Sequence, residues 1–203
     1  MTHHDMHPTS SITYRTLIRR FEAAPPGKLF CIHGDRSVFR LSLHAASHAL
    51  LAGMPIALVD GSNRFDLYYI TEFARRVAGG RVQPGQLLER IFISRAFTCY
   101  QMEAVITDRL PEFVEKRRVP VAIIFGLLDT FYDEQAPLFE VKAGLQRVIA
   151  GLQKLKRAHV SVLLASLDMK PASQERNALF PKLAAAMDQT VRLVEGEFTP
   201  RRI

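Results

Sequence analysis

The chain has 203 residues, of which 48% are hydrophobic and 23% are charged, proportions typical of a globular protein. No apolar run approaches the roughly 18 to 20 residues of a membrane-spanning helix, and the opening residues MTHHDMHPTSS lack the basic and apolar regions of a secretory signal. Length and composition therefore favour one domain with a substantial core, located in the cytoplasm and without a membrane partner.

The chain is basic, with 27 Lys and Arg against 20 Asp and Glu and a net charge of +7. Proteins of this kind can bind nucleic acid, but basic surfaces without that function are common. The charge alone therefore predicts no partner.

Neither the cysteines nor the histidines predict a metal site. Cys31 and Cys99 form no C-x-x-C pair, so we expect reduced thiols that pack as small apolar side chains. His44 and His48 lie four positions apart, a spacing that can hold a metal ion, but no third ligand follows them. Three more histidines, in a polar stretch with poor geometry for a metal, are His3, His4 and His7.

Residues 1–27 are predicted to form an N-terminal arm with one helix. From Ile12 onward apolar side chains recur at helical spacing, and the pair Pro25-Pro26 ends the pattern. Residues 28–195 are expected to form the core domain and residues 196–203 a tail.

Buried strands alternate with amphipathic helices throughout the core domain. The predicted strands are Leu29–His33, Ile56–Asp60, Ile91–Ser94, Val121–Phe125, Val160–Ala165 and Thr190–Val194. The predicted helices are Ser37–Leu51, Leu67–Val77, Cys99–Lys116 and Phe139–Arg157. Pro84-Gly85 is interpreted as a turn, and residues 129–137 and 166–177 as polar loops. Alternation of this kind predicts a doubly wound α/β domain with a mainly parallel sheet and helices on both faces.

The turn after the first strand has the spacing of a phosphate-binding P-loop, G-x-x-x-x-G-K-[ST]. Its eight residues run from Gly34 to Leu41. Phe39 replaces the second glycine and would crowd the turn, Arg40 replaces the lysine, and Leu41 replaces the metal-binding hydroxyl. The spacing is preserved while most of the chemistry is lost.

The order of segments and several short motifs resemble the ATPase core of the RecA-like recombinases, in the branch that contains RadA and its eukaryotic relatives. The resemblance covers about Lys28 to Glu195 and implies a RecA-like P-loop fold. The matching motifs are the loop Gly34–Leu41, Val59-Asp60 with Phe65-Asp66 beyond it, Ser94–Thr98 and Leu127–Tyr132.

The resemblance also implies that the chain departs from the family at its catalytic positions. In such ATPases a lysine and a hydroxyl residue of the loop hold the phosphates and magnesium, and an aspartate at a strand end supports the metal. These positions correspond to Arg40, Leu41 and Gly126, and the glutamate that activates water corresponds to Ser62. No catalytic residue is therefore predicted, and the chain is interpreted as a pseudo-ATPase with degenerate Walker motifs.

The leading interpretation is a catalytically inactive RecA-like accessory protein of DNA recombination or repair, which binds a partner protein or DNA and needs no cofactor. An alternative is a sensor that binds a nucleotide without hydrolysing it. Its phosphate-binding candidates are Gly34, Arg36, Ser37 and Arg40. A weaker alternative is an ATPase whose missing acids are supplied by Asp129 or Asp133.

The candidates for DNA contact are cations near the carboxyl ends of the strands, where ligands of open α/β sheets bind, and cations of the late polar loop. They are Arg64, Arg95, Lys170 and Arg176. The segment Phe21-Glu22-Ala23-Ala24 has the F-x-x-A form that members of the family use to dock onto a neighbouring subunit, which leaves homo-oligomer formation open.

Overall fold

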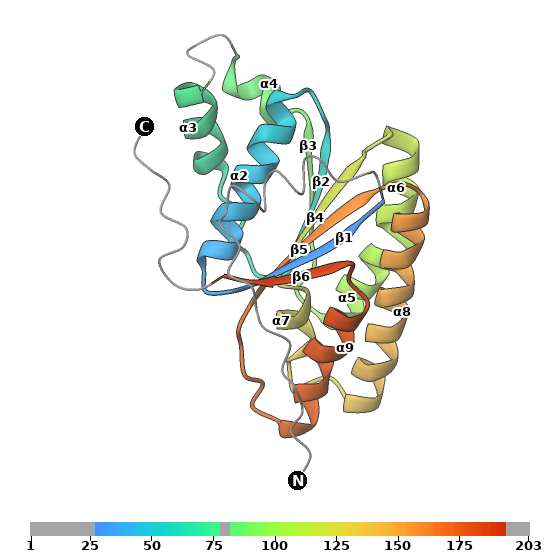
Figure 1. Ribbon diagram of the computed structural model, residues 1–203. Helices are drawn as coiled ribbons and strands as arrows, with labels where there is room; N and C mark the ends of the chain where they lie inside the picture. The colour runs from blue at the N-terminus through green and yellow to red at the C-terminus, as the bar shows by residue number, and fades with distance from the viewer. Residues whose placement is uncertain (1–26, 78–81, 194–203) are drawn as a thin grey trace.

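The computed structural model describes residues 27–77 and 82–193, which form an α/β fold around a six-stranded parallel sheet (Figure 1). The strands are β1 (Leu29–Gly34), β2 (Ile56–Asp60), β3 (Ile91–Arg95), β4 (Val121–Phe125), β5 (Ser161–Leu167) and β6 (Gln189–Arg192). Their order across the sheet is β3-β2-β4-β5-β1-β6, and every pair of neighbours is parallel. The predicted parallel sheet is confirmed, and each strand agrees with its prediction to within two residues at either end among the described residues.

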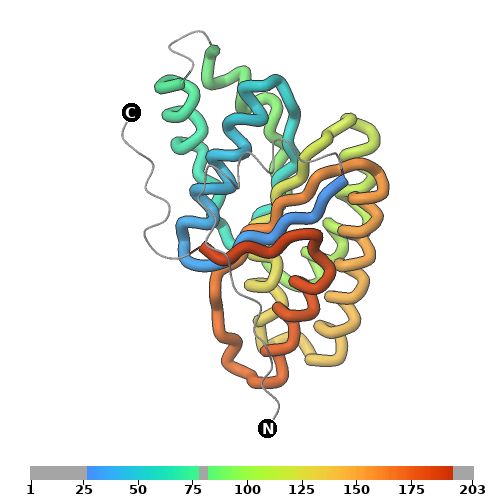
Figure 2. Tube along the Cα trace, in the orientation of Figure 1, coloured from blue at the N-terminus to red at the C-terminus, as the bar shows by residue number. Residues whose placement is uncertain are grey.

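Helices cover both faces of the sheet, as Figures 1 and 2 show. One face carries α2 (Ser37–Leu51), α3 (Leu67–Val77) and α4 (Pro84–Leu88). The other face carries α5 (Cys99–Ala104), η1 (Val105–Arg109), α6 (Leu110–Arg117), α7 (Leu127–Phe131), α8 (Leu138–Arg157) and α9 (Leu179–Ala185). Helices on both faces explain why the central strand β4, with sequence VAIIF, is buried at every residue.

The two faces have separate hydrophobic cores because side chains alternate along each strand. Phe30 and Ile32 of β1 pack in the core beneath α2, and Leu29 and Cys31 pack in the core beneath α8. Burial raises the pKa of the Cys31 thiol to about 12, and Asp168 contributes in the same direction. Cys31 and Cys99 are both free and buried, as the sequence predicts.

Three short elements differ from the prediction. The expected helix from Cys99 to Lys116 is interrupted by the π-helical turn η1, whose Ile106 carbonyl oxygen lies 3.0 Å from where a side chain at Gly151 of α8 would begin. Residues 129–137 are not wholly a loop, because α7 occupies Leu127–Phe131 and buries Leu127, Leu128 and Phe131. The expected turn at Pro84-Gly85 is the start of α4.

The last third of the chain contains structure that the sequence pattern did not indicate. The predicted loop 166–177 begins inside β5, which continues to Leu167, and ends inside the 3-10 helix η2 (Gln174–Ala178). The helix α9 follows it without a break, and no helix was predicted there. The predicted N-terminal helix, the early histidines, the F-x-x-A segment and the C-terminal tail lie outside the described residues.

Arg176 of η2 is an interior side chain, which corrects its prediction as a DNA contact. Only 4% of its surface is exposed. Its guanidinium donates one hydrogen bond to the carbonyl oxygen of Phe131 and one to that of Ala136, each at 2.6 Å. Arg176 therefore joins η2 to the segment between α7 and α8, and DNA cannot reach it in this structure.

Replacing Arg176 by methionine is expected to lower the free energy of unfolding by about 2–3 kcal/mol, because two buried carbonyl groups lose a charged donor. Urea denaturation followed by circular dichroism measures the change. The matched control is Lys170→Met, an exposed cation of the same connection, which should change stability by less than about 0.5 kcal/mol. Equal effects of the two substitutions would contradict the structural role of Arg176.

Candidate functional site

The carboxyl ends of the strands, with the turns that follow them, form the edge of the sheet at which the predicted residues meet. In open α/β sheets ligands bind at this edge, between neighbouring strands whose connections leave toward opposite faces. Three such pairs exist among the described strands: β1 with β5, β2 with β4, and β2 with β3. Four predicted cations of this edge are exposed, namely Arg36, Arg40, Arg95 and Lys170.

The turn after β1 is too short to form an open phosphate loop. The helix α2 begins at Ser37, so only Asp35 and Arg36 separate it from Gly34 at the end of β1. The Asp35 carboxylate accepts a hydrogen bond from the backbone amide of Ser37 at 2.7 Å. A phosphate at a helix N-terminus binds such amides, and here a carboxylate of the chain occupies the first one.

The backbone near Leu193 covers Gly34 from the other side. The Leu193 amide donates to the His33 carbonyl oxygen at 2.8 Å. A Cβ atom on Gly34, whose φ is +148°, would lie 2.4 Å from the Leu193 carbonyl oxygen, so a residue with a side chain does not fit there. The glycine of the P-loop pattern therefore permits close packing of the chain against itself.

The other residues of the pattern face away from the turn. Phe39 and Leu41 are 3% and 1% exposed, and the Phe39 ring packs edge-on against Phe125 of β4 with centroids 5.2 Å apart. Arg40 is exposed, and its guanidinium carbon lies 5.8 Å from the centre of the Tyr69 ring on α3. The structure thus turns Arg40 toward α3, whereas Gly34 and Ser37 remain in the turn.

A buried aspartate shapes the loop after β2. Asp60 is 0% exposed, and its carboxylate accepts hydrogen bonds from the amides of Ser62, Arg64 and Phe65 at 3.2, 3.0 and 2.9 Å. Asp60 was not predicted as a site residue, although an acid at the end of a buried strand is a signal for such a role. Asp60 fixes the positions from which Ser62 and Arg64 extend.

Ser62, Arg64 and Asp129 come together where the loop after β2 meets α7. The turn between β4 and α7 is Gly126, with φ of +60°, and a Cβ atom there would lie 2.4 Å from the Ser62 Cβ atom and 2.9 Å from an Asp129 carboxylate oxygen. Three buried polar atoms of this junction, Ser62 Oγ, Arg64 Nε and Asp129 Oδ1, have no hydrogen-bond partner within the described ranges. The structure therefore unites three residues that the sequence analysis assigned to separate roles.

Its burial makes Asp129 a poor substitute for a metal-binding aspartate, because burial disfavours the charged form that a metal ligand needs. Burial raises the pKa of this carboxyl group, and the nearby charge of Arg64 opposes the rise without cancelling it. Asp133, the second proposed acid, is exposed and accepts a hydrogen bond from the Gln135 amide at 3.0 Å. Neither acid lies at the end of β4 itself, where Gly126 stands.

A third polar group joins β1, β5 and β6 at the same edge. Asp168 accepts hydrogen bonds from His33 Nδ1 at 2.6 Å and from Arg192 Nε at 2.7 Å. Burial raises the pKa of Asp168, but its contacts with His33 and Arg192 outweigh this effect and hold the pKa below its usual range. The Phe180 ring of α9 lies 4.7 Å from the His33 ring, so the group is also packed from one side.

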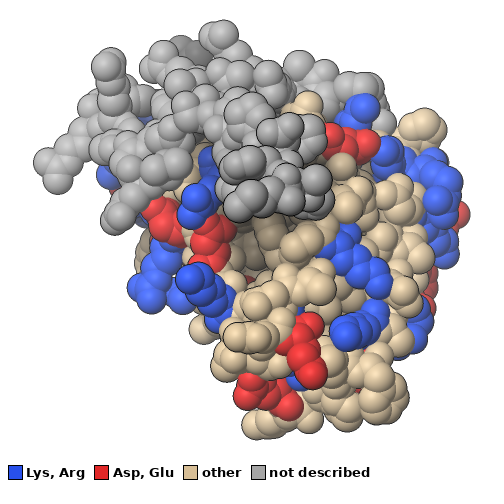
Figure 3. All heavy atoms as spheres, turned by 60° about the horizontal axis from the view of Figure 1, so that its bottom comes forward, with Lys and Arg blue, Asp and Glu red and all other residues tan. Residues whose placement is uncertain are grey.

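The surface has two further features, a mixture of charges and a groove. In the view of Figure 3, Lys and Arg side chains alternate with Asp and Glu side chains and form no continuous basic surface. A groove of about 740 Å³ lies at the opposite edge of the sheet, between α6 and the end of α8, and its walls include Glu112, Arg118 and Lys154.

Within residues 27–77 and 82–193, no three His, Cys, Asp or Glu side chains are grouped to hold a metal ion. No helix of these residues is long and apolar enough to cross a membrane.

Comparison with known proteins adds no family. No protein-family model matches the chain, and no curated protein matches its sequence. The RecA-like resemblance stays a prediction from the motifs, and the structure itself establishes an α/β fold with a parallel sheet.

Replacing Asp168 by asparagine is expected to lower the free energy of unfolding by about 1 kcal/mol at pH 7, because two charge-assisted hydrogen bonds are weakened. A carboxyl group whose pKa is lower in the folded protein stabilises the fold above its ordinary pKa, here 3.8, and this contribution is lost as the pH falls through the folded-state value. The stability difference between the wild type and Asp168→Asn should therefore shrink below about pH 4.

Urea denaturation between about pH 3 and pH 7 measures this dependence. The exposed Glu134→Gln, which removes a carboxylate outside this group, is the control and should show no comparable effect. A difference between wild type and Asp168→Asn that stayed constant over the whole range would argue against an ionised Asp168 in this group.

Proposed function

We propose that this protein is a catalytically inactive, RecA-like accessory protein of DNA recombination or repair, which acts by binding DNA or a partner protein. The observation that carries the proposal is the closed turn after β1. Asp35 occupies the first amide of α2, Leu193 covers Gly34, and Phe39 is buried in the core. A nucleotide would have to displace all three to reach the amides that a P-loop offers to phosphates.

The positions that would hold magnesium support the same proposal. Leu41, at the place of the metal-binding hydroxyl, is buried on the core side of α2, and β4 is followed by Gly126 in place of an acid. The protein has no carboxylate or hydroxyl at these two positions, which are the usual protein ligands of magnesium in P-loop enzymes. Hydrolysis would therefore lack its charge-stabilising metal.

The connection with DNA is supported by the motifs and by unpaired cations. The Arg-Ala-Phe piece at Arg95–Phe97 begins at the last residue of β3, close to its place in the recombinases that the sequence resembles. In the described part of the chain, Arg36, Arg40, Arg64 and Arg95 have no carboxylate within ion-pair distance. Cations without internal partners are available to phosphates or to acidic groups of another protein.

Purified protein is expected to hydrolyse neither ATP nor GTP above background in the presence of magnesium. Loss of one charge-stabilising contact already costs phosphoryl transfer on the order of a thousandfold, and several are absent here. A coupled phosphate-release assay measures the rate, with Asp129→Ala as the matched variant. Turnover of about one per minute that Asp129→Ala abolishes would contradict the proposal and favour an ATPase with relocated acids.

A fluorescent ATP analogue tests the sensor alternative with the same preparation. The proposal expects no saturable binding, since the chain itself occupies the turn after β1. Binding without turnover that weakens in Arg36→Ala and Arg40→Ala, but not in the control Arg95→Ala, would replace the proposal by a non-hydrolysing nucleotide sensor.

A further inference from the structure

We propose that the first turns of α2 and α3 form a binding surface for single-stranded DNA, in which Arg36, Arg40 and Arg64 contact phosphates and Tyr68 stacks on a base. This inference rests on the proposed function and assigns it a surface and a form of nucleic acid. It also moves the expected contact away from the late loop, since Arg176 is buried.

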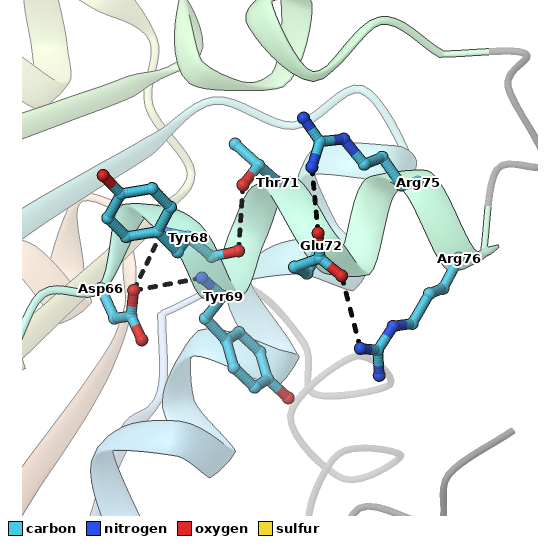
Figure 4. A network of polar contacts seen from close by, with 7 residues as sticks. All are labelled: Asp66, Tyr68, Tyr69, Thr71, Glu72, Arg75 and Arg76. Carbon is cyan, nitrogen blue, oxygen red and sulfur yellow. Dashed lines mark hydrogen bonds and ion pairs between the residues drawn. The ribbon is translucent and has the colours of Figure 1, made fainter.

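Tyr68 has the placement of a stacking residue. It lies in the first turn of α3 and is 78% exposed. The Asp66 carboxylate fixes this turn by accepting hydrogen bonds from the amides of Tyr68 and Tyr69 at 2.9 and 3.2 Å, as Figure 4 shows. Tyr69 turns toward α2, where its hydroxyl lies 3.1 Å from His44 Nδ1, whereas the Tyr68 ring extends away from the helix. An exposed ring on a fixed backbone can stack on a base at low cost in conformational entropy.

Three arginines lie in the first turn of α2 or in the segments directly before α2 and α3. Arg36 and Arg40 lie four residues apart at the start of α2, so they share one side of the helix, and both are exposed. The guanidinium of Arg40 lies over the ring of Tyr69, the residue next to Tyr68. Arg64 lies four residues before Tyr68 in the sequence, in the loop that leads to α3. Its guanidinium carbon lies 6.0 Å from the centre of the Phe39 ring. Cations interleaved with an exposed aromatic ring are the combination with which proteins hold a single strand.

The carboxylates of the same turns are directed at backbone amides. Asp35 accepts from the amide of Ser37, Asp60 accepts from three amides of the loop after β2, and Asp66 caps α3. None of them has an ion pair with the three arginines in the described part of the chain. The negative charges therefore hold the turns in place. Arg36 and Arg40 remain exposed, whereas Arg64 is half-buried, with its Nε atom enclosed and its charge near Asp129.

At the C-terminal end of α3 the arginines form ion pairs, so they can be compared with the arginines of the proposed surface. Arg75 and Arg76 both bind Glu72, at 3.0 and 3.3 Å, so their charges are already compensated (Figure 4). Tyr100 on α5 is likewise an exposed tyrosine, but its hydroxyl donates to Glu140, whose negative charge would repel a phosphate. The helix α3 thus carries two compensated arginines, and the opposite face of the sheet carries an exposed tyrosine beside an acid, both suitable as controls.

The experiment uses the full-length chain and a labelled oligothymidylate that contains one 2-aminopurine. Fluorescence anisotropy gives the affinity and its dependence on salt, and the 2-aminopurine signal reports stacking. Three phosphate contacts predict a log-log salt slope of roughly −2, from about −0.7 per contact. Arg36→Glu combined with Arg40→Glu should reduce the slope to about −0.7, whereas Arg75→Glu combined with Arg76→Glu should leave it nearly unchanged.

Tyrosine variants separate stacking from attraction between charges. Tyr68→Ser should weaken binding about tenfold without changing the salt slope, and it should remove the 2-aminopurine quenching. Tyr68→Phe, which keeps the ring, should retain both, and Tyr100→Ser should behave as the wild type. Because all these residues are exposed, circular dichroism and urea midpoints are expected to match the wild type and verify that the variants fold.

Three outcomes would overturn this inference. No binding by the wild type at about 50 mM salt would leave a partner protein as the target, and the absence of nucleotide turnover would still support the accessory function. Equal losses from the two arginine pairs would indicate diffuse attraction without a specific surface. Binding of duplex DNA as tight as that of single strands, with no effect of Tyr68→Ser, would indicate backbone contacts alone.

Discussion

The packing of Phe39 against Phe125 determines how the chain leaves β1. Phe39 lies in the first turn of α2, which begins at Ser37, and from there its ring reaches the core against Phe125. Truncation of a buried phenylalanine typically costs about 3–5 kcal/mol, so an open loop over the same residues would forfeit a large part of a domain's net stability. The burial of Phe39 therefore favours the short turn, which the Asp35 hydrogen bond and the cover of Gly34 by Leu193 accompany.

The carboxylates of the sheet edge show how a basic protein distributes its charge. Asp35, Asp60 and Asp66 each lie where a strand ends or a helix begins, and each binds amides of its own turn. Caps of this kind contribute about 0.5–2 kcal/mol each, and they direct negative charge inward. Of the arginines between them, Arg36 and Arg40 are exposed and Arg64 is half-buried, and none of the three has an ion pair in the described part of the chain. Composition alone could not reveal this arrangement.

Local pattern predicted the regular elements of this fold, and contacts distant in sequence account for what it missed. The strands and the long helices α2, α3 and α8 have strong apolar periodicity and lie where it indicates. The short helices α7 and α9 have one or two turns each, too few for a periodic signal, and they form because their apolar residues pack beneath α8.

The candidate site residues also differ in whether the sequence alone could predict their roles. Arg40 and Leu41 could be singled out because they depart from a contiguous motif. The roles of Asp168 and Arg176 could not, because Asp168 binds His33, 135 positions away, and Arg176 binds Phe131, 45 positions away. Whether an arginine at the end of a polar loop faces DNA or the protein interior depends on such partners. Gly126 shows how packing couples the loop after β2 to the turn after β4. Its left-handed backbone and the 2.4 Å approach of the Ser62 Cβ atom mean that an aspartate at 126 would displace Ser62 and Asp129 together. Ser62 Oγ and Asp129 Oδ1 already lack hydrogen-bond partners there, a cost of about 1–3 kcal/mol for each group that the tight contact must offset. The junction of the two loops therefore leaves no room for an acid at position 126, and an aspartate there would disrupt the packing before it could bind a metal.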